Sequence, residues 1–98
     1  MSRLDVNRSG EIEVFVRVVS LGGFSSAARA FNMTPSAVSK LVARLESRLG
    51  TRLLNRSTRK LQLTAEGAAF YERGLRILED MATAEREVSA GAEPQGLG

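Results

Sequence analysis

Basic side chains are concentrated in the middle third of the chain, where they can bind a polyanion. Residues 29–60 contain eight basic residues and one acidic residue, a net charge of +7, whereas residues 1–28 are neutral and residues 61–98 carry −4. Six of the eight basic residues are arginines, and a guanidinium group can donate two parallel hydrogen bonds to a phosphate or to a guanine edge. This distribution indicates binding to nucleic acid, with a solvated basic face as the alternative.

The composition excludes several kinds of chemistry. The sequence contains neither cysteine nor histidine, so it has no disulfide framework, no cysteine-ligated zinc or iron–sulfur site and no imidazole for acid–base catalysis. Gly22-Gly23 lacks the spacing and the Lys-Ser/Thr ending of a phosphate-binding loop. We therefore expect no catalytic residues, no metal site and no cofactor.

The length and hydropathy of the chain indicate one small domain. A chain of 98 residues leaves no room for two domains. No apolar run approaches the roughly 18 residues that a membrane span needs, and residues 1–10 lack the apolar region of a secretory signal. We expect an intracellular protein that does not associate with membranes.

The first predicted helix is apolar on two sides. Ser9 is its expected N-cap, and it extends to about Leu21. One face carries Ile12, Phe15, Val16 and Val19, and the nearly opposite side carries Val14, Val18 and Leu21. Alternate positions from Ile12 to Val18 also fit a strand, but Phe15 and Val19 break that alternation and favour a helix. Because a helix with two apolar faces usually has two partners, we expect Val14 and Val18 to contact a second subunit.

Two further helices are predicted between Gly22 and Gly50. Gly22-Gly23 ends the first helix, Ser25 is the expected cap of a short helix over residues 26–31, and a turn follows. Thr34 as N-cap and Pro35 at the first helical position predict a third helix from Pro35 to about Leu49. Its core face carries Val38, Leu41, Val42, Leu45 and Leu49.

A hairpin and a long helix complete the chain. Residues 52–55 and 61–63 are expected to pair as short strands around the basic loop 56–60. Thr64 then caps a helix to about Ala90, and residues 91–98 are expected to form a hinge tail. A heptad seam runs along this helix: Phe70, Gly74, Ile77, Met81, Ala84 and Val88. Because a small domain cannot cover this seam, we expect a homodimer, with interface residues Val14, Val18, Phe70, Ile77, Met81 and Val88.

The order of these elements is that of a winged helix-turn-helix, in which the second helix of the motif enters the major groove of DNA. The expected fold class is therefore mainly α, with three helices and a two-stranded wing over residues 1–63 and a long dimerisation helix over residues 64–90. With Val38 directed at the core, Ser36, Lys40 and Ala43 point outward. Short residues permit close approach to a groove, and Lys40 can donate to guanine O6 and N7.

Other residues are expected to contact DNA around this recognition helix. The backbone N–H groups near Ser25 and Ser26 are expected to hold a phosphate, and Arg59 in the wing is expected to enter the minor groove. Arg56 has two interpretations that stay open, an ion pair with Glu46 and a DNA contact. The full set of candidate DNA-binding residues is Ser25, Ser26, Thr34, Pro35, Ser36, Ala37, Ser39, Lys40, Arg44, Arg56 and Arg59.

Several linked motifs resemble the N-terminal domain of LysR-type transcriptional regulators. They are Phe24-Ser25-Ser26-Ala27-Ala28, Thr34 to Lys40, Leu45-Glu46-x-x-Leu49-Gly50, Leu53-Leu54-x-Arg56-x-x-Arg59 and Leu63-Thr64-x-x-Gly67. The resemblance covers about Phe15 to Gly74. Gly23, Phe31 and Leu54 depart from it, since serine, leucine and phenylalanine are usual at these positions. Gly23 removes one hydroxyl that could contact a phosphate.

The resemblance implies a bacterial, DNA-associated cytoplasmic regulator that binds a partly palindromic double-stranded DNA site as a homodimer. Within the family, positions that match Pro35, Ser36, Ala37, Ser39, Lys40 and Arg59 face DNA. The resemblance further implies a C-terminal effector-binding domain, which is absent from this sequence, and a possible tetramer at full length. We expect an isolated or truncated DNA-binding portion, so that a small-molecule effector acts only through the missing domain.

A different class of function is also compatible with the residues. The heptads and the basic centre equally suit a helical dimerisation module that binds an acidic protein. Sequence-dependent binding to duplex DNA at several salt concentrations distinguishes the two, because an acid-binding module shows only weak, nonspecific DNA binding.

Overall fold

The structure is a computed structural model that describes residues 7–56 and 60–97, with side chains described up to Ala90. These residues form, in order, α1 (Arg8–Leu21), α2 (Phe24–Phe31), α3 (Pro35–Leu49), β1 (Leu54–Asn55), β2 (Gln62–Leu63) and α4 (Ala65–Leu97). The two strands pair antiparallel, with Leu54 opposite Leu63. The expected winged helix-turn-helix followed by a long helix is confirmed.

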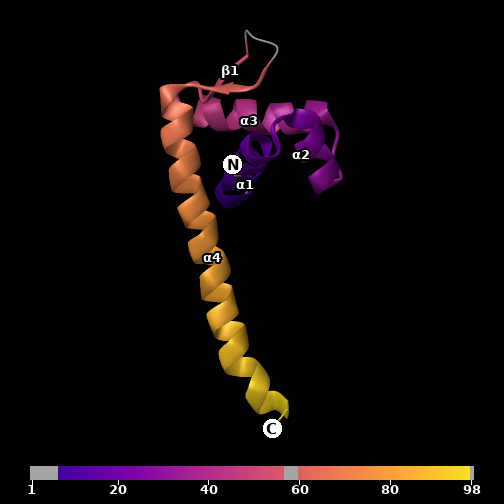
Figure 1. Ribbon diagram of the computed structural model, residues 1–98, viewed down its shortest axis with the longest axis vertical. Helices are drawn as coiled ribbons and strands as arrows, with labels where there is room; N and C mark the ends of the chain where they lie inside the picture. Colours follow the sequence, from indigo (N-terminus) through magenta and orange to yellow (C-terminus); the bar gives the residue numbers. More distant parts are fainter. Residues whose placement is uncertain (1–6, 57–59, 98) are drawn as a thin grey trace, which may run out of the picture.

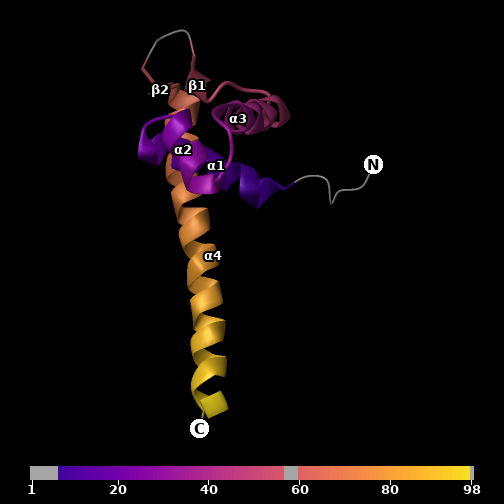
Figure 2. The same ribbon diagram turned by 90° about the vertical axis from the view of Figure 1, so that its right-hand side faces the viewer.

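The first three helices gather around one end of α4, and the rest of α4 extends beyond them (Figures 1 and 2). α1 packs against all three other helices. The centre of the core is fully buried and comes from α1, α3 and the segment leading into β1: Phe15, Val18, Val38, Val42, Leu45, Leu53 and Leu54. This core holds α2 and α3 together and attaches them, through α1, to α4.

Helix starts differ from the sequence expectation at two places. The N-cap of α1 is Asn7, whose Oδ1 accepts from the Gly10 N–H at 2.9 Å, so Ser9 lies inside the helix and the expected Ser9 cap was wrong. α2 begins at Phe24 after Gly23, which makes no side-chain cap. The expected Ser25 cap was therefore also wrong, because the partly buried Phe24 packs against the core and brings the helix start forward. The predicted caps at Thr34 and Thr64 are confirmed, since their Oγ1 atoms accept from Ala37 N–H and Gly67 N–H.

The second apolar stripe of α1 does not face a second subunit. Val18 is fully buried and Val14 is only 6% exposed. Because α2, α3 and α4 surround α1, these valines belong to the core of the same chain. Their assignment to the dimer interface was wrong.

The heptad seam of α4 divides into two parts. Its first two members pack inside the chain: the Phe70 and Phe15 ring centroids lie 5.7 Å apart, and Gly74 is buried against Val16 of α1. Phe70 therefore packs against the core of its own chain, and because it is also partly exposed, its place in the dimer interface stays a prediction. Farther along, Ile77, Met81 and Val88 are 42%, 41% and 72% exposed, so these three remain available to a second chain.

The end of α4 also differs from expectation. The helix continues to Leu97, whereas a hinge tail was expected from Gly91, so that boundary was wrong. Ala90, Ala92 and Glu93 favour a helix, whereas Gly91, Pro94 and Gly96 oppose it by about 1–3 kcal/mol each, so helix propensity does not explain the extension.

Gly67 permits the close approach of α4 to the segment before β1. A Cβ at this position would overlap the Leu53 carbonyl oxygen, and a backbone atom cannot move aside as a flexible side chain does. We expect Gly67→Ala to lower the free energy of unfolding by about 1–3 kcal/mol, as overpacking does. Urea denaturation followed by circular dichroism measures this. Ala68→Ser, at the exposed neighbouring position, should stay within about 0.5 kcal/mol of wild type. Equal stability of the two variants would contradict the close approach.

Candidate nucleic-acid interface

The outer face of α3 is free and lined by short side chains around one lysine. Ser36, Lys40 and Ala43 are all exposed, whereas Val38 and Val42 on the opposite face are fully buried. Pro35 and Arg44 are likewise exposed, and Ala37 is half-buried. The predicted orientation of this helix is therefore confirmed, and the short side chains on its outer face permit close approach to a groove.

The first turn of α2 lies next to the base of the wing. An open groove is lined by Gly23 and Ser25 from the start of α2 and by Arg56 and Lys60 from the hairpin. Ser25 is exposed and Ser26 half-buried. The structure thus brings these serines close to two cationic residues, although they lie within the helix and do not cap it.

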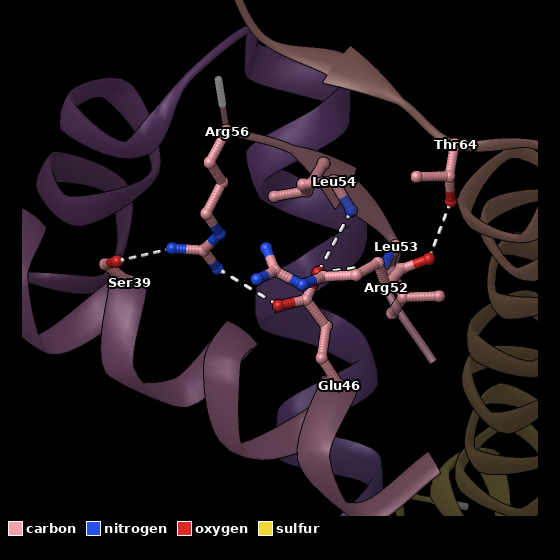
Figure 3. A network of polar contacts seen from close by, with 7 residues as sticks. All are labelled: Ser39, Glu46, Arg52, Leu53, Leu54, Arg56 and Thr64. Carbon is pink, nitrogen blue, oxygen red and sulfur yellow. Dashed lines mark hydrogen bonds and ion pairs between the residues drawn. The ribbon is translucent and has the colours of Figure 1, made fainter. Parts of the chain in front are cut away.

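Arg56 connects the wing to both helices of the motif (Figure 3). Its Nη2 donates to Glu46 Oε1 at 3.4 Å, its Nη1 donates to Ser39 Oγ at 2.9 Å, and its guanidinium lies 5.3 Å from the centroid of the Phe24 ring. The ion pair with Glu46 that the sequence left open is therefore present. A cation over an aromatic face adds further attraction.

Glu46 is the centre of this network. It is only 8% exposed, and its Oε2 accepts from the backbone N–H groups of Leu53 and Leu54 at 2.8 and 3.0 Å. From the sequence, Glu46 was expected only as a partner of Arg56, and its backbone contacts were not predicted. Its position four residues after the buried Val42 signals that it lies on the inner face of α3.

A second buried carboxylate also holds the C-terminal end of α3. Glu11 of α1 is 5% exposed, and its Oε1 accepts from Arg48 Nη2 at 2.6 Å and Arg48 Nε at 3.1 Å. This pair was not predicted from the sequence, although Glu11 stands four residues before the buried Phe15. The pair ties the last turn of α3 to the start of α1, so Arg48 has a structural role.

The remaining candidates are placed as follows. Thr34 uses its Oγ1 as the cap of α3, Ser39 is half-buried beside Arg56, and Arg59 lies outside the described residues. Arg52 was not among the candidates, but it is exposed and lines an open groove together with Ala43 and Ser47 of α3. Its place beside the outer face of α3 adds a cation to the surface.

The described part of the chain lacks two other kinds of feature. Within residues 7–56 and 60–97, no group of three or more acidic side chains could hold a metal ion. Among the described helices, none is long and apolar enough to cross a membrane.

Comparison with known proteins identifies the family. Residues 10–68 match the lysR family of bacterial regulatory helix-turn-helix proteins. The chain belongs to the LysR family. The relatives reported below are named as transcriptional regulators, in agreement with the expectation that the chain is not an enzyme.

Two curated LysR-family relatives show the extent of the similarity. The regulator CrgA of Neisseria meningitidis serogroup C (strain 8013) is 54% identical over 90 residues, which are 91% of this chain and 30% of CrgA. The activator AaeR of Escherichia coli (strain K12) is 40% identical over 76 residues, covering 78% of this chain and 25% of AaeR. The chain thus spans about a third or less of the length of these relatives.

Solved structures of LysR-family proteins have the same fold. The BenM DNA-binding domain in complex with catB site 1 DNA superposes with a TM-score of 0.83 at 27% identity, covering 87% of this chain and 94% of that one. CrgA from Neisseria meningitidis superposes with a TM-score of 0.72 at 54% identity, covering 87% of this chain and 29% of CrgA. The winged helix and its long helix are therefore those of LysR-type DNA-binding domains.

Proposed function

We propose that this chain is the sequence-specific, double-stranded DNA-binding domain of a LysR-type transcriptional regulator and acts as a homodimer in the bacterial cytoplasm. The observation that carries the proposal is the outer face of α3, which is exposed and basic while the opposite face is buried. The complex of the similar BenM domain with DNA supports it. In this proposal α3 lies in the major groove and the wing, residues 56–60, lies at the minor groove.

Affinity and sequence preference come from different residues in this mechanism. Phosphate contacts, from Arg44 and from the backbone near Ser25 and Ser26, supply affinity that falls steeply with salt. Base contacts come from the outer face of α3, where Lys40 is the longest donor near the N-terminal half. Pro35, Ser36 and Ala37 lie against the groove wall, and Arg59 enters the minor groove.

The homodimer presents two recognition helices to a partly palindromic site. Ile77, Met81 and Val88 on the free part of α4 are the proposed interface residues, because they are large, apolar and exposed. At full length a tetramer and a C-terminal domain for a small-molecule effector are part of the same proposal, by analogy with the longer relatives.

Lys40→Ala is the most direct test of DNA recognition. We expect it to weaken binding to the preferred duplex by about 1–3 kcal/mol and to relax the preference at one base pair, because the guanine-reading donor is removed. The duplex is first selected from a random pool with the wild-type chain, and affinity is then measured by gel shift at several salt concentrations.

A matched control separates recognition from bulk charge. Arg86→Ala removes the same charge from the distal part of α4 and should change neither the affinity nor the preferred bases by more than about twofold. If Lys40→Ala kept wild-type affinity and base preference, Lys40 would not be the reading residue. If wild type bound all duplexes alike and only weakly, the acid-binding module would be the better function.

A further inference from the structure

Arg56 controls the hydrogen-bond direction of a residue on the recognition helix. Its Nη1 donates to Ser39 Oγ at 2.9 Å, and Ser39 lies one residue before Lys40 on α3. A serine hydroxyl has one hydrogen to donate and two lone pairs that accept, whereas a guanidinium has donors only. The Arg56 contact therefore occupies a lone pair of Ser39 and leaves its hydrogen directed elsewhere.

The guanidinium that makes this contact is held on several sides. Glu46 Oε1 accepts from its other terminal nitrogen, and the ring of Phe24 lies beneath it. Glu46 is itself buried and fixed by the backbone N–H groups of Leu53 and Leu54. Figure 3 shows Arg56 between Ser39 and Glu46, so its position does not depend on a contact with DNA.

The Ser39 hydrogen has no acceptor within the described part of the chain. A serine inside a helix often donates back to the carbonyl four residues earlier, which here belongs to Pro35. Among residues 7–56 and 60–97, the only hydrogen bond of Ser39 Oγ is the one that it accepts from Arg56. Its hydroxyl is half-buried on the helix that approaches the groove, so the hydrogen is available to a ligand.

We propose that Arg56 is a positioning residue that holds the Ser39 hydroxyl so that it donates its hydrogen toward DNA. This inference rests on the proposed function. The group opposite the Ser39 hydrogen is then an acceptor, namely a purine N7, a base carbonyl or a phosphate oxygen. In this role Arg56 acts through Ser39.

The experiment uses the duplex that the wild-type chain selects from a random pool, with single atoms removed. In separate duplexes, 7-deazapurine removes N7, 2-aminopurine removes guanine O6, 5-methyl-2-pyrimidinone removes thymine O4, and a methylphosphonate removes a phosphate charge. We expect one of these deletions to weaken wild-type binding about threefold to tenfold, the effect of one hydrogen bond. In Ser39→Ala the same deletion should have no effect. Ser47→Ala, an exposed serine of α3 without an arginine partner, should respond as wild type does.

Arg56→Lys tests the positioning role. A lysine keeps the charge but cannot contact Glu46 and Ser39 through two nitrogens at once. We expect this variant to respond less than wild type to the critical deletion, and Ser39→Ala to cause little further loss in its background. Thermal unfolding of each variant verifies that it is folded.

The outcomes separate failure of the inference about Ser39 and Arg56 from failure of the proposed DNA-binding function. The inference would be overturned if removing a base amino group weakened the binding of wild type but not that of Ser39→Ala. It would also be overturned if Arg56→Lys lost the same affinity as wild type in every altered duplex. Should Arg56→Lys not fold, the comparison of Ser39→Ala with Ser47→Ala still decides whether Ser39 donates. Failure of the wild-type chain to enrich any duplex would instead overturn the proposed function, and this inference with it.

Discussion

Replacing Glu46 by alanine should lower the free energy of unfolding by about 2–4 kcal/mol, because it leaves two buried backbone donors and a partly buried guanidinium without their acceptor. In this chain the groups left behind are the guanidinium of Arg56 and the backbone N–H groups of Leu53 and Leu54. A buried donor without a partner costs about 1–3 kcal/mol, so the loss exceeds that of a surface ion pair. Urea denaturation followed by circular dichroism measures the change.

Two variants make the Glu46 result specific. Glu46→Gln keeps one acceptor oxygen for the backbone but loses the charge, so its loss should fall between wild type and Glu46→Ala. Glu72→Ala removes an exposed carboxylate from α4 and should stay within about 0.5 kcal/mol of wild type. A loss below about 1 kcal/mol for Glu46→Ala would show that the network does not hold α3 to the wing.

Introducing aspartate on the free part of the α4 seam should dissociate the proposed dimer. We expect Ile77→Asp and Met81→Asp each to raise the dimer dissociation constant at least about 100-fold, because the interface would bury an unpaired carboxylate. Both side chains are about two-fifths exposed in the single chain, so the domain itself should stay folded. Sedimentation velocity over a range of concentrations measures the association.

The control for this prediction adds the same charge at a polar position. Ser89→Asp lies on the exposed surface of α4 and should leave the dissociation constant within about threefold of wild type. Intact dimers for both Ile77→Asp and Met81→Asp would place the interface on another surface. An unfolded Ile77→Asp variant would instead show that this part of α4 belongs to the core of the domain.

The orientation of α3 follows from the sequence because it depends on local spacing. Thr34, Pro35 and Gly50 mark its ends, and apolar residues at steps of three and four place Ser36 and Lys40 on the outer side. The same local rules misplaced two helix starts. Asn7, which is as good an N-cap as Ser9, caps α1. The packing of Phe24 against the core starts α2 before Ser25.

By itself, the sequence determined the order of the elements, the basic centre and the outward face of the recognition helix, because each depends on residues close together in the chain. The neighbours of α1 and the partners of the buried carboxylates Glu11 and Glu46 follow from contacts between distant segments. Val14 and Val18 suit a subunit interface by periodicity, yet they lie in the core, since periodicity indicates that a face is covered and not which element covers it. Likewise, Ser39 and Glu46 of α3 meet Arg56 only because the hairpin folds back onto α3. The spacing of residues along one helix does not predict such a contact between distant segments.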